Sequence, residues 1–255
     1  MTRDTLSAKQ IVRELEKAGV VCLQSFFDLR SVEKMRGEAL NLLGARQALR
    51  STPSNLDERC PTLHQALNSN LFREMAVGYD RKCQFFFDAV VEHDTTFGEK
   101  ITDIHFDMLR SLKFMIYLSD VDKSSAAFRY CVGSHQDNHK LRNRFLLMGG
   151  KLPKLPNVPG PNEDHDLTDI EGPRGTLIVF DTDGFHSAGS LQEGKDRLIV
   201  RGRTLLSGWF EHSVLRFAAG LNPLGFFAPL LAPKGRLTTR GKARGERAQM
   251  GGVIQ

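Results

Sequence analysis

Hydrophobic residues in the first eighty positions recur with a helical period. Ile11, Val12 and Leu15 fall on one face of a segment that begins after Ser7, a good N-cap, and stops at Gly19. The same period predicts two further helices, and a short β-branched run follows the first one. The predicted helices cover 7–18, 30–49 and 63 (or 71) to 79, the β-branched run covers 20–23, and the polar stretch 51–62 is predicted to be a loop.

After position 80 the pattern changes to short aromatic and β-branched segments, which are typical of strands. Within 112–118, Lys113, Met115 and Tyr117 share one face, because side chains two apart in a strand project the same way. The predicted strands cover 82–92, 103–108, 112–118, 128–132, 176–181 and 197–206, a helix is predicted at 140–147, and the proline-rich stretch 151–166 is predicted to be an irregular loop.

This order of elements predicts a mainly β (α+β) fold. Helices followed by many short strands favour a double-stranded β-helix, a jelly-roll or cupin-like core, with an N-terminal helical layer. The chain has 255 residues, of which 40% are hydrophobic and 25% charged, so a sizeable core is expected. We predict a single domain over 1–233 and a flexible basic tail over 234–255.

Charge and cysteine content indicate which binding partners and which cellular compartment to expect. The net charge of +5 arises in 234–247, where six Lys and Arg residues stand against one Glu, and no aromatic residue lies among them. Stacking surfaces for nucleic acid need such aromatics, so we predict no nucleic-acid partner. No apolar run approaches the ~20 residues of a spanning helix, which predicts no integral membrane association. Four scattered cysteines and no signal-peptide pattern predict a cytoplasmic protein with reduced thiols.

The candidate chemistry centres on His105-Phe106-Asp107. In a strand the imidazole and the carboxylate would project side by side, as two arms of a metal site. Among the eight histidines, His186 is the best third ligand, because it follows a buried strand and precedes a Ser-Ala-Gly-Ser turn. Two histidines and one carboxylate on one face suit non-haem Fe(II). A second His-x-Asp, at 135–137 with His139 nearby, lacks flanking apolar alternation and is predicted to be a surface loop.

Arg197 lies eleven residues after His186 and opens the next apolar strand. A guanidinium deep in a barrel favours a planar carboxylate partner. With these features the chain, over roughly 7–210, resembles the phytanoyl-CoA dioxygenase family of Fe(II)/2-oxoglutarate oxygenases. The matching stretches are His105-Phe106-Asp107, 112–122, Gly133-Ser134-His135, Gly175-Thr176-Leu177 through His186 to Arg197, and the entry at 18–21.

The resemblance implies a site and a reaction. His105, Asp107 and His186 would bind iron, and Arg197 would bind the distal carboxylate of 2-oxoglutarate. With O2 as second cosubstrate, the expected reaction hydroxylates an unactivated C–H of a small metabolite and releases succinate and CO2. The carboxylate Asp107 argues against halogenation, because related halogenases lack that ligand. Desaturation, ring closure and epimerisation stay open.

Further residues share the predicted inward face. Lys113 and Tyr117 are predicted to line the cosubstrate site. Arg201 and Arg203 keep the phase of Arg197 and would favour an anionic substrate if they line the mouth, although either could instead be solvated. The chain departs from the family at 125–127 and at Val132, which concerns loop geometry, and at Ala188, where relatives often carry a hydroxyl.

Two other function classes remain. A hydrolase or isomerase could hold zinc with the same three ligands, although Arg197 would then have no role. A non-catalytic jelly-roll binding module would hold no metal. The identity of the small-molecule substrate and the oligomeric state are left open by the sequence.

Overall fold

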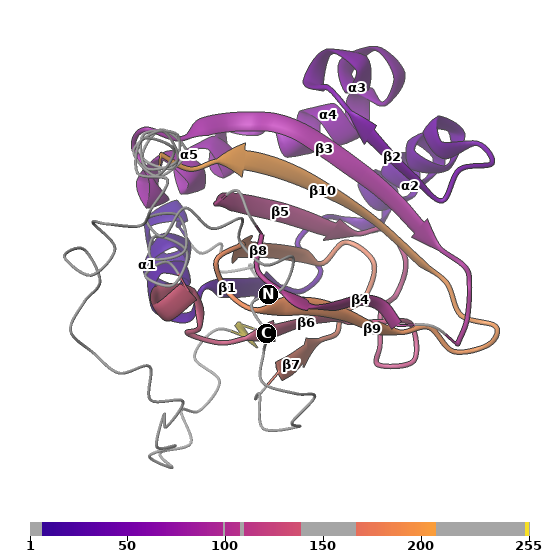
Figure 1. The fold of residues 1–255 in the computed structure, drawn as a ribbon. Coiled ribbons are helices and arrows are strands. Elements are labelled where there is room, and N and C mark those ends of the chain that lie inside the picture. Colours follow the sequence, from indigo (N-terminus) through magenta and orange to yellow (C-terminus); the bar gives the residue numbers. More distant parts are fainter. Residues whose placement is uncertain (1–6, 99, 108–109, 139–166, 208–252, 255) are drawn as a thin grey trace, which may run out of the picture.

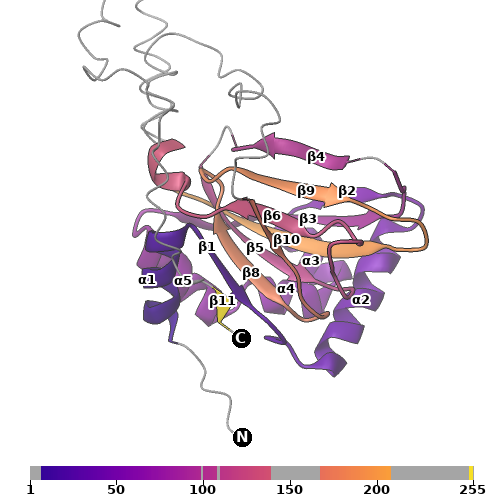
Figure 2. The same ribbon diagram turned by 90° about the horizontal axis from the view of Figure 1, so that it is seen from below.

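The computed structural model describes residues 7–98, 100–107, 110–138, 167–207 and 253–254. Two β-sheets face each other, and helices cover the outer side of the larger one (Figures 1 and 2). The helix predicted at 140–147, the proline-rich loop and nearly all of the basic tail lie outside the described residues, and so does His139.

The larger sheet has, within the described residues, seven strands in the order β11-β1-β8-β5-β10-β3-β2, and the smaller sheet has four in the order β4-β9-β6-β7. Neighbouring strands are antiparallel except β1 and β11. The strands are β1 (Val20–Leu23), β2 (Ala48–Ser51), β3 (Gln84–Asp94), β4 (Lys100–His105), β5 (Ser111–Tyr117), β6 (Phe128–Cys131), β7 (Leu167–Ile170), β8 (Leu177–Asp181), β9 (His186–Ser190), β10 (Arg197–Leu205) and β11 (Val253–Ile254).

Alternation along the strands divides the core into two parts. On β5, Phe114 and Ile116 point to the helices, and Phe114 stacks on Phe72 with ring centroids 4.6 Å apart. Met115 and Tyr117 point the other way, into the space between the sheets. The predicted inward face of this strand is therefore confirmed, and Lys113 shares it.

The helices are α1 (Ala8–Ala18), α2 (Leu29–Leu43), α3 (Pro53–Arg59), α4 (Pro61–Leu67) and α5 (Asn70–Tyr79). The first matches its prediction, with a capping box at Ser7 and a left-handed cap at Gly19. The predicted end of the second helix at Leu49 was wrong. Gly44 ends it with a φ of +56°, and the residues beyond it pair with β3 as β2.

The loop predicted over 51–62 was also wrong, because two short helices occupy most of it. Each begins with a proline, and Thr52 caps the first by accepting a hydrogen bond from the Asn55 amide. Proline has no N–H to donate, and the first turn of a helix leaves that N–H without a partner, so Pro53 and Pro61 start these helices rather than break them.

Three predictions in the β region need correction. The turn expected after His186 is strand β9, and β7 was not predicted. The strand predicted over 103–108 ends at His105, so Asp107 lies beyond it. His135 was predicted on a surface loop; it is buried, and its Nε2 lies 3.1 Å from the carbonyl oxygen of Glu16 at the end of α1.

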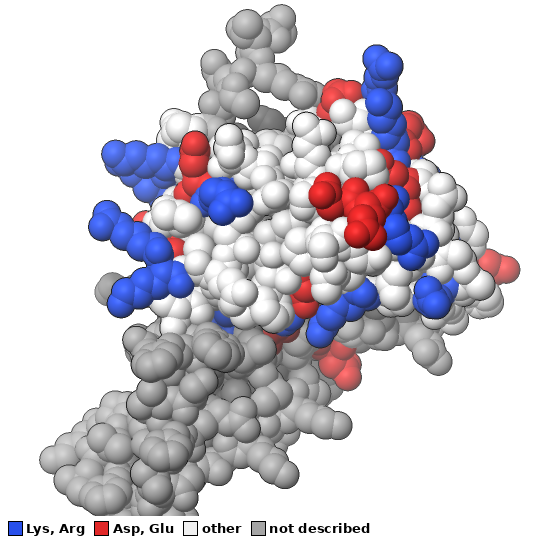
Figure 3. All heavy atoms as spheres, turned by 90° about the horizontal axis from the view of Figure 1, so that it is seen from above, with Lys and Arg blue, Asp and Glu red and all other residues white. Residues whose placement is uncertain are grey.

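No helix in the described part of the chain is long and apolar enough to span a membrane. Figure 3 views the molecule from above the orientation of Figure 1. On this face basic and acidic side chains are interspersed with uncharged groups.

Candidate metal centre

The two histidines meet because β4 ends where β9 begins. His105, the last residue of β4, is the direct partner of His186, the first residue of β9, and their ring centroids are 4.4 Å apart. Asp107 reaches the same place by another route. Its amide donates to the carbonyl of Thr182, just after β8, at 3.0 Å, and this bond folds the segment back toward the histidines.

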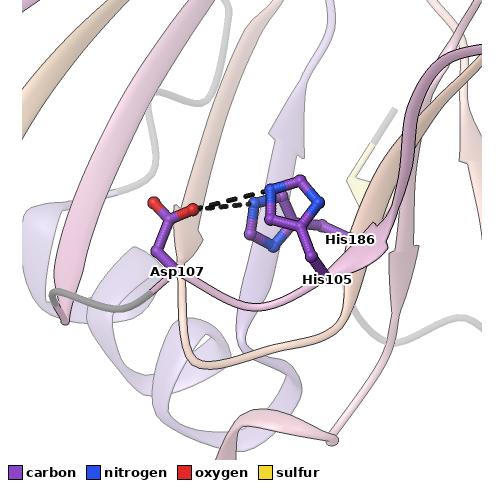
Figure 4. A group of neighbouring side chains, drawn as sticks. All are labelled: His105, Asp107 and His186. Atoms are coloured by element: carbon purple, nitrogen blue, oxygen red, sulfur yellow. Dashed lines mark ion pairs between the residues drawn. The ribbon is translucent and has the colours of Figure 1, made fainter. Parts of the chain in front are cut away.

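The three predicted metal ligands converge. Asp107 Oδ1 lies 3.6 Å from Nε2 of His105 and 3.6 Å from Nε2 of His186 (Figure 4). Among the described residues, one ligand atom from each of the three falls within 4.8 Å of the others. A metal ion accepts ligand atoms grouped in this way, so the structure brings together the three residues that the sequence singled out.

Backbone contacts set the tautomer of both rings. His105 Nδ1 lies 2.7 Å from the carbonyl oxygen of Asp103, and His186 Nδ1 lies 2.8 Å from that of Gly184. A carbonyl oxygen only accepts, so each Nδ1 carries the hydrogen and each Nε2 presents a lone pair toward Asp107. Histidines that bind metals are held in this manner by their second nitrogen.

The pKa shifts of Asp107 and His186 favour the protonation states that bind a metal. Burial by itself would raise the pKa of Asp107, but the Lys113 ammonium, 2.6 Å from Asp107 Oδ2, holds that pKa well below its usual value. Burial lowers the pKa of His186, against the opposite effect of Asp107. A carboxylate and neutral imidazoles are the forms that bind a cation.

Lys113 was predicted to line the cosubstrate site, and it contacts the carboxylate of Asp107. Burial lowers the pKa of its ammonium, while Asp107 raises it. The contact occupies Oδ2 and leaves Oδ1 toward the histidines. Lys113 and Asp107 thus form an ion pair that orients the carboxylate.

Arg197 and Tyr117 lie on the same inward face, farther from the triad along their strands. Arg197 is buried, its Nε and Nη2 contact Asp94 Oδ2 at 2.9 and 2.8 Å, and its Nη1 donates to the carbonyl of Ala126. The Tyr117 hydroxyl donates to the carbonyl of Ile170 at 2.7 Å. Their predicted contacts with a cosubstrate stay predictions.

The second His-x-Asp does not join the triad, because His135 is directed to α1. The sequence did not predict the positions of two further cationic side chains. Arg110 contacts the buried Asp181 at 3.2 Å, and Arg50, on the unpredicted β2, lines a cavity that reaches Asp107. Arg50 reaches this cavity because β2 pairs with β3, a contact between distant segments that a local sequence pattern does not reveal.

No family model matches the chain, and no curated protein matches it. Solved structures do match. The non-haem alpha-ketoglutarate-dependent epimerase SnoN from nogalamycin biosynthesis has a TM-score of 0.59 at 14% identity, over 78% of this chain and 83% of SnoN. The chain has the jelly-roll fold.

SnoN is also known in complex with Fe3+, alpha ketoglutarate and nogalamycin RO. EctD from S. alaskensis with bound Fe matches at a TM-score of 0.58 and 14% identity, over 81% of this chain and 79% of EctD. The predicted fold class, with its N-terminal helices, is therefore confirmed. None of these structures carries the name of the phytanoyl-CoA dioxygenase family, so that likeness stays a resemblance.

Proposed function

We propose that this protein is an Fe(II)- and 2-oxoglutarate-dependent oxygenase that hydroxylates an unactivated C–H of a small molecule. The observation that carries the proposal is the convergence of His105 Nε2, His186 Nε2 and Asp107 Oδ1 at the end of the paired strands β4 and β9. Two imidazoles and one carboxylate on one side leave other positions of an iron ion open for ligands. The structural neighbours with iron and alpha ketoglutarate in their names support this choice of metal and cosubstrate.

When bound, iron with 2-oxoglutarate and O2 supplies the oxidising power to remove a hydrogen atom from an unactivated C–H bond. The residues of the chain would bind the iron and orient its ligands. His105 and His186 would ligate through Nε2 and Asp107 through Oδ1, and Lys113 keeps Oδ2 occupied. Phe180 and Phe128 pack against His186, with ring centroids 5.3 and 5.9 Å away, and shield that side of the centre from water.

Arg197 is the proposed partner of the distal carboxylate of 2-oxoglutarate. A guanidinium has five N–H groups, and its contacts among the described residues use three of them. Tyr117 would form the wall next to it. Burial raises the pKa of Tyr117 and the charge of Arg197 acts to lower it, so the two side chains are within electrostatic reach.

The test is succinate release by purified protein under air with Fe(II), 2-oxoglutarate and a panel of small molecules. We expect turnover that depends on iron and is lost in Asp107→Ala and His105→Ala. His64→Gln is the matched control, because His64 lies outside the triad and pairs with Asp57. Undiminished succinate release by Asp107→Ala would refute the assignment.

The same assay separates the other function classes. Product formation with zinc and without 2-oxoglutarate would indicate a hydrolase or isomerase, and failure to bind metal would indicate a binding module. Product analysis would distinguish hydroxylation from desaturation, cyclisation and epimerisation, the last being the activity in the name of SnoN.

A further inference from the structure

We infer that the substrate is a small anion, and that its charged group binds a cationic cluster beside the metal centre. The cationic cluster consists of Arg50, Lys113, Arg201 and Arg203. The inference rests on the proposed function and adds to it the class of substrate and the residues that select it.

The cluster lines a cavity of about 270 Å³ whose wall includes the metal-ligand residue Asp107. This volume is slightly below the usual range for small-molecule sites, so it suits a small metabolite or one end of a larger one. A molecule in this cavity contacts the cluster and lies beside the triad at the same time.

Strand register explains how the four cations meet. Lys113 on β5 is the direct partner of Arg203 on β10. Two residues away on β10, Arg201 is the partner of Val90 on β3, and Val90 is the partner of Arg50 on β2. Residues two apart on a strand share a face, so β5, β10 and β2 direct these four side chains into the same cavity, with β3 lying between β10 and β2.

Acidic partners hold the arginines in place. Asp88 binds Arg203 in bidentate fashion, with Nε to Oδ1 at 2.9 Å and Nη2 to Oδ2 at 2.5 Å, and Arg201 pairs with Glu92. These pairs fix the guanidinium planes before any ligand arrives. Arginine has more N–H donors than one carboxylate can accept, so donors remain for an anionic ligand.

The charges of the cavity wall are not balanced. Among the described lining residues, four cations stand against the carboxylates of Asp88 and Asp107, which gives 4 − 2 = +2. Including Glu92, the partner of Arg201, gives 4 − 3 = +1. A divalent metal and dianionic 2-oxoglutarate cancel each other, so this excess remains for a substrate with one or two negative charges, a carboxylate or a phosphate.

Exposure gives the direction of entry. The exposed fraction of the side chain falls from 67% for Arg50 to 25% for Arg201 and 17% for Arg203. A ligand would therefore enter from the side of Arg50.

Arg197 lies six residues before Arg203 on β10, about 20 Å away at ~3.3 Å per residue. The distal carboxylate of the cosubstrate and the charged group of the substrate would therefore occupy opposite ends of this strand.

The experiment uses the full chain loaded anaerobically with Fe(II) and 2-oxoglutarate. The visible absorption of the iron–2-oxoglutarate chelate reports first on the proposed function. Calorimetric titrations at constant ionic strength then measure binding of inorganic phosphate and of acetate. The variants are Arg50→Gln and Arg201→Gln, and Arg46→Gln is the matched control, an exposed arginine outside the cavity wall.

We expect one of the two probes to bind the wild-type chain and Arg46→Gln equally, and about tenfold more weakly to Arg201→Gln, since a charge-assisted hydrogen bond is lost. The exposed Arg50 should have a smaller effect in the same direction. Preference for phosphate would indicate a phosphorylated substrate, and preference for acetate a carboxylate. Because Arg50 is at the surface, its variant is expected to fold even if Arg201→Gln does not.

Two results would overturn the inference. One is normal chelate absorption with no binding of either probe, or with binding that neither substitution weakens. The other is loss of 2-oxoglutarate affinity in the variants with unchanged probe binding, which would assign the cluster to the cosubstrate. Absence of the chelate absorption in the wild-type chain refutes instead the proposed function, so the two failures are distinguishable.

Discussion

Replacement of Lys113 by methionine tests how the metal centre is balanced electrostatically. Methionine keeps the length and apolar stem of lysine but removes the ammonium that lies 2.6 Å from Asp107 Oδ2. The exposed fractions of the two side chains are 15% and 22%, so the pair is largely buried. Breaking a buried pair costs ~3–5 kcal/mol, and partial exposure places this one near the lower end.

A loss of about 3 kcal/mol in the metal-free protein corresponds to a fall in Tm of roughly 6–12 °C for a chain of this size. With a divalent ion bound, Asp107 has another cation to interact with, so the loss should be smaller. The variant should therefore gain more stability from metal than the wild-type chain, which by linkage means tighter metal binding.

The assay is thermal unfolding with a chelator and with a series of Mn(II) concentrations. Lys123→Met is the matched control, because Lys123 is exposed and distant in sequence from the triad. A smaller metal-induced rise in Tm for Lys113→Met than for the wild-type chain would refute this reasoning. It would mean that Lys113 matters more for orienting Oδ1 than for neutralising Asp107.

Three further predictions concern residues around the centre. Arg197→Leu should raise the KM for 2-oxoglutarate by about 10- to 100-fold with a smaller change in kcat, measured by succinate release; an unchanged KM would remove Arg197 from the cosubstrate site. Gly184→Ala should weaken Mn(II) binding and lower Tm, because a Cβ there would lie 1.8 Å from the Tyr130 hydroxyl; normal Mn(II) titrations would contradict this. Tyr79→Phe removes a 2.7 Å hydrogen bond to the buried Asp181 and should cost about 1–3 kcal/mol in urea unfolding, with no change in m.

Local sequence was sufficient for several parts of the fold. Ser7 and Gly19 determine the ends of α1 through contacts within a few residues, and the alternation on β5 follows from the strand period alone. At Pro53 and Pro61 the local sequence did not determine whether a helix or a loop forms. Proline is compatible with a helix start and with a loop, and packing of the apolar faces of α3 and α4 against the sheet favours the helix here.

The candidate site also has features that the sequence alone determined and features that depended on tertiary structure. The sequence alone determined which side chains could bind a metal, because the residue types and spacing of His105, Asp107 and His186 carry that chemistry. Tertiary structure decided how they meet: His105 pairs with His186 across two strands, and a bond to Thr182 brings in Asp107 after the strand has ended. Only tertiary structure places Arg50 beside Arg201, because strand pairing between β2, β3 and β10 joins segments about 150 residues apart. Periodicity acts within an element, whereas the selection of neighbouring strands depends on the packing of the whole chain.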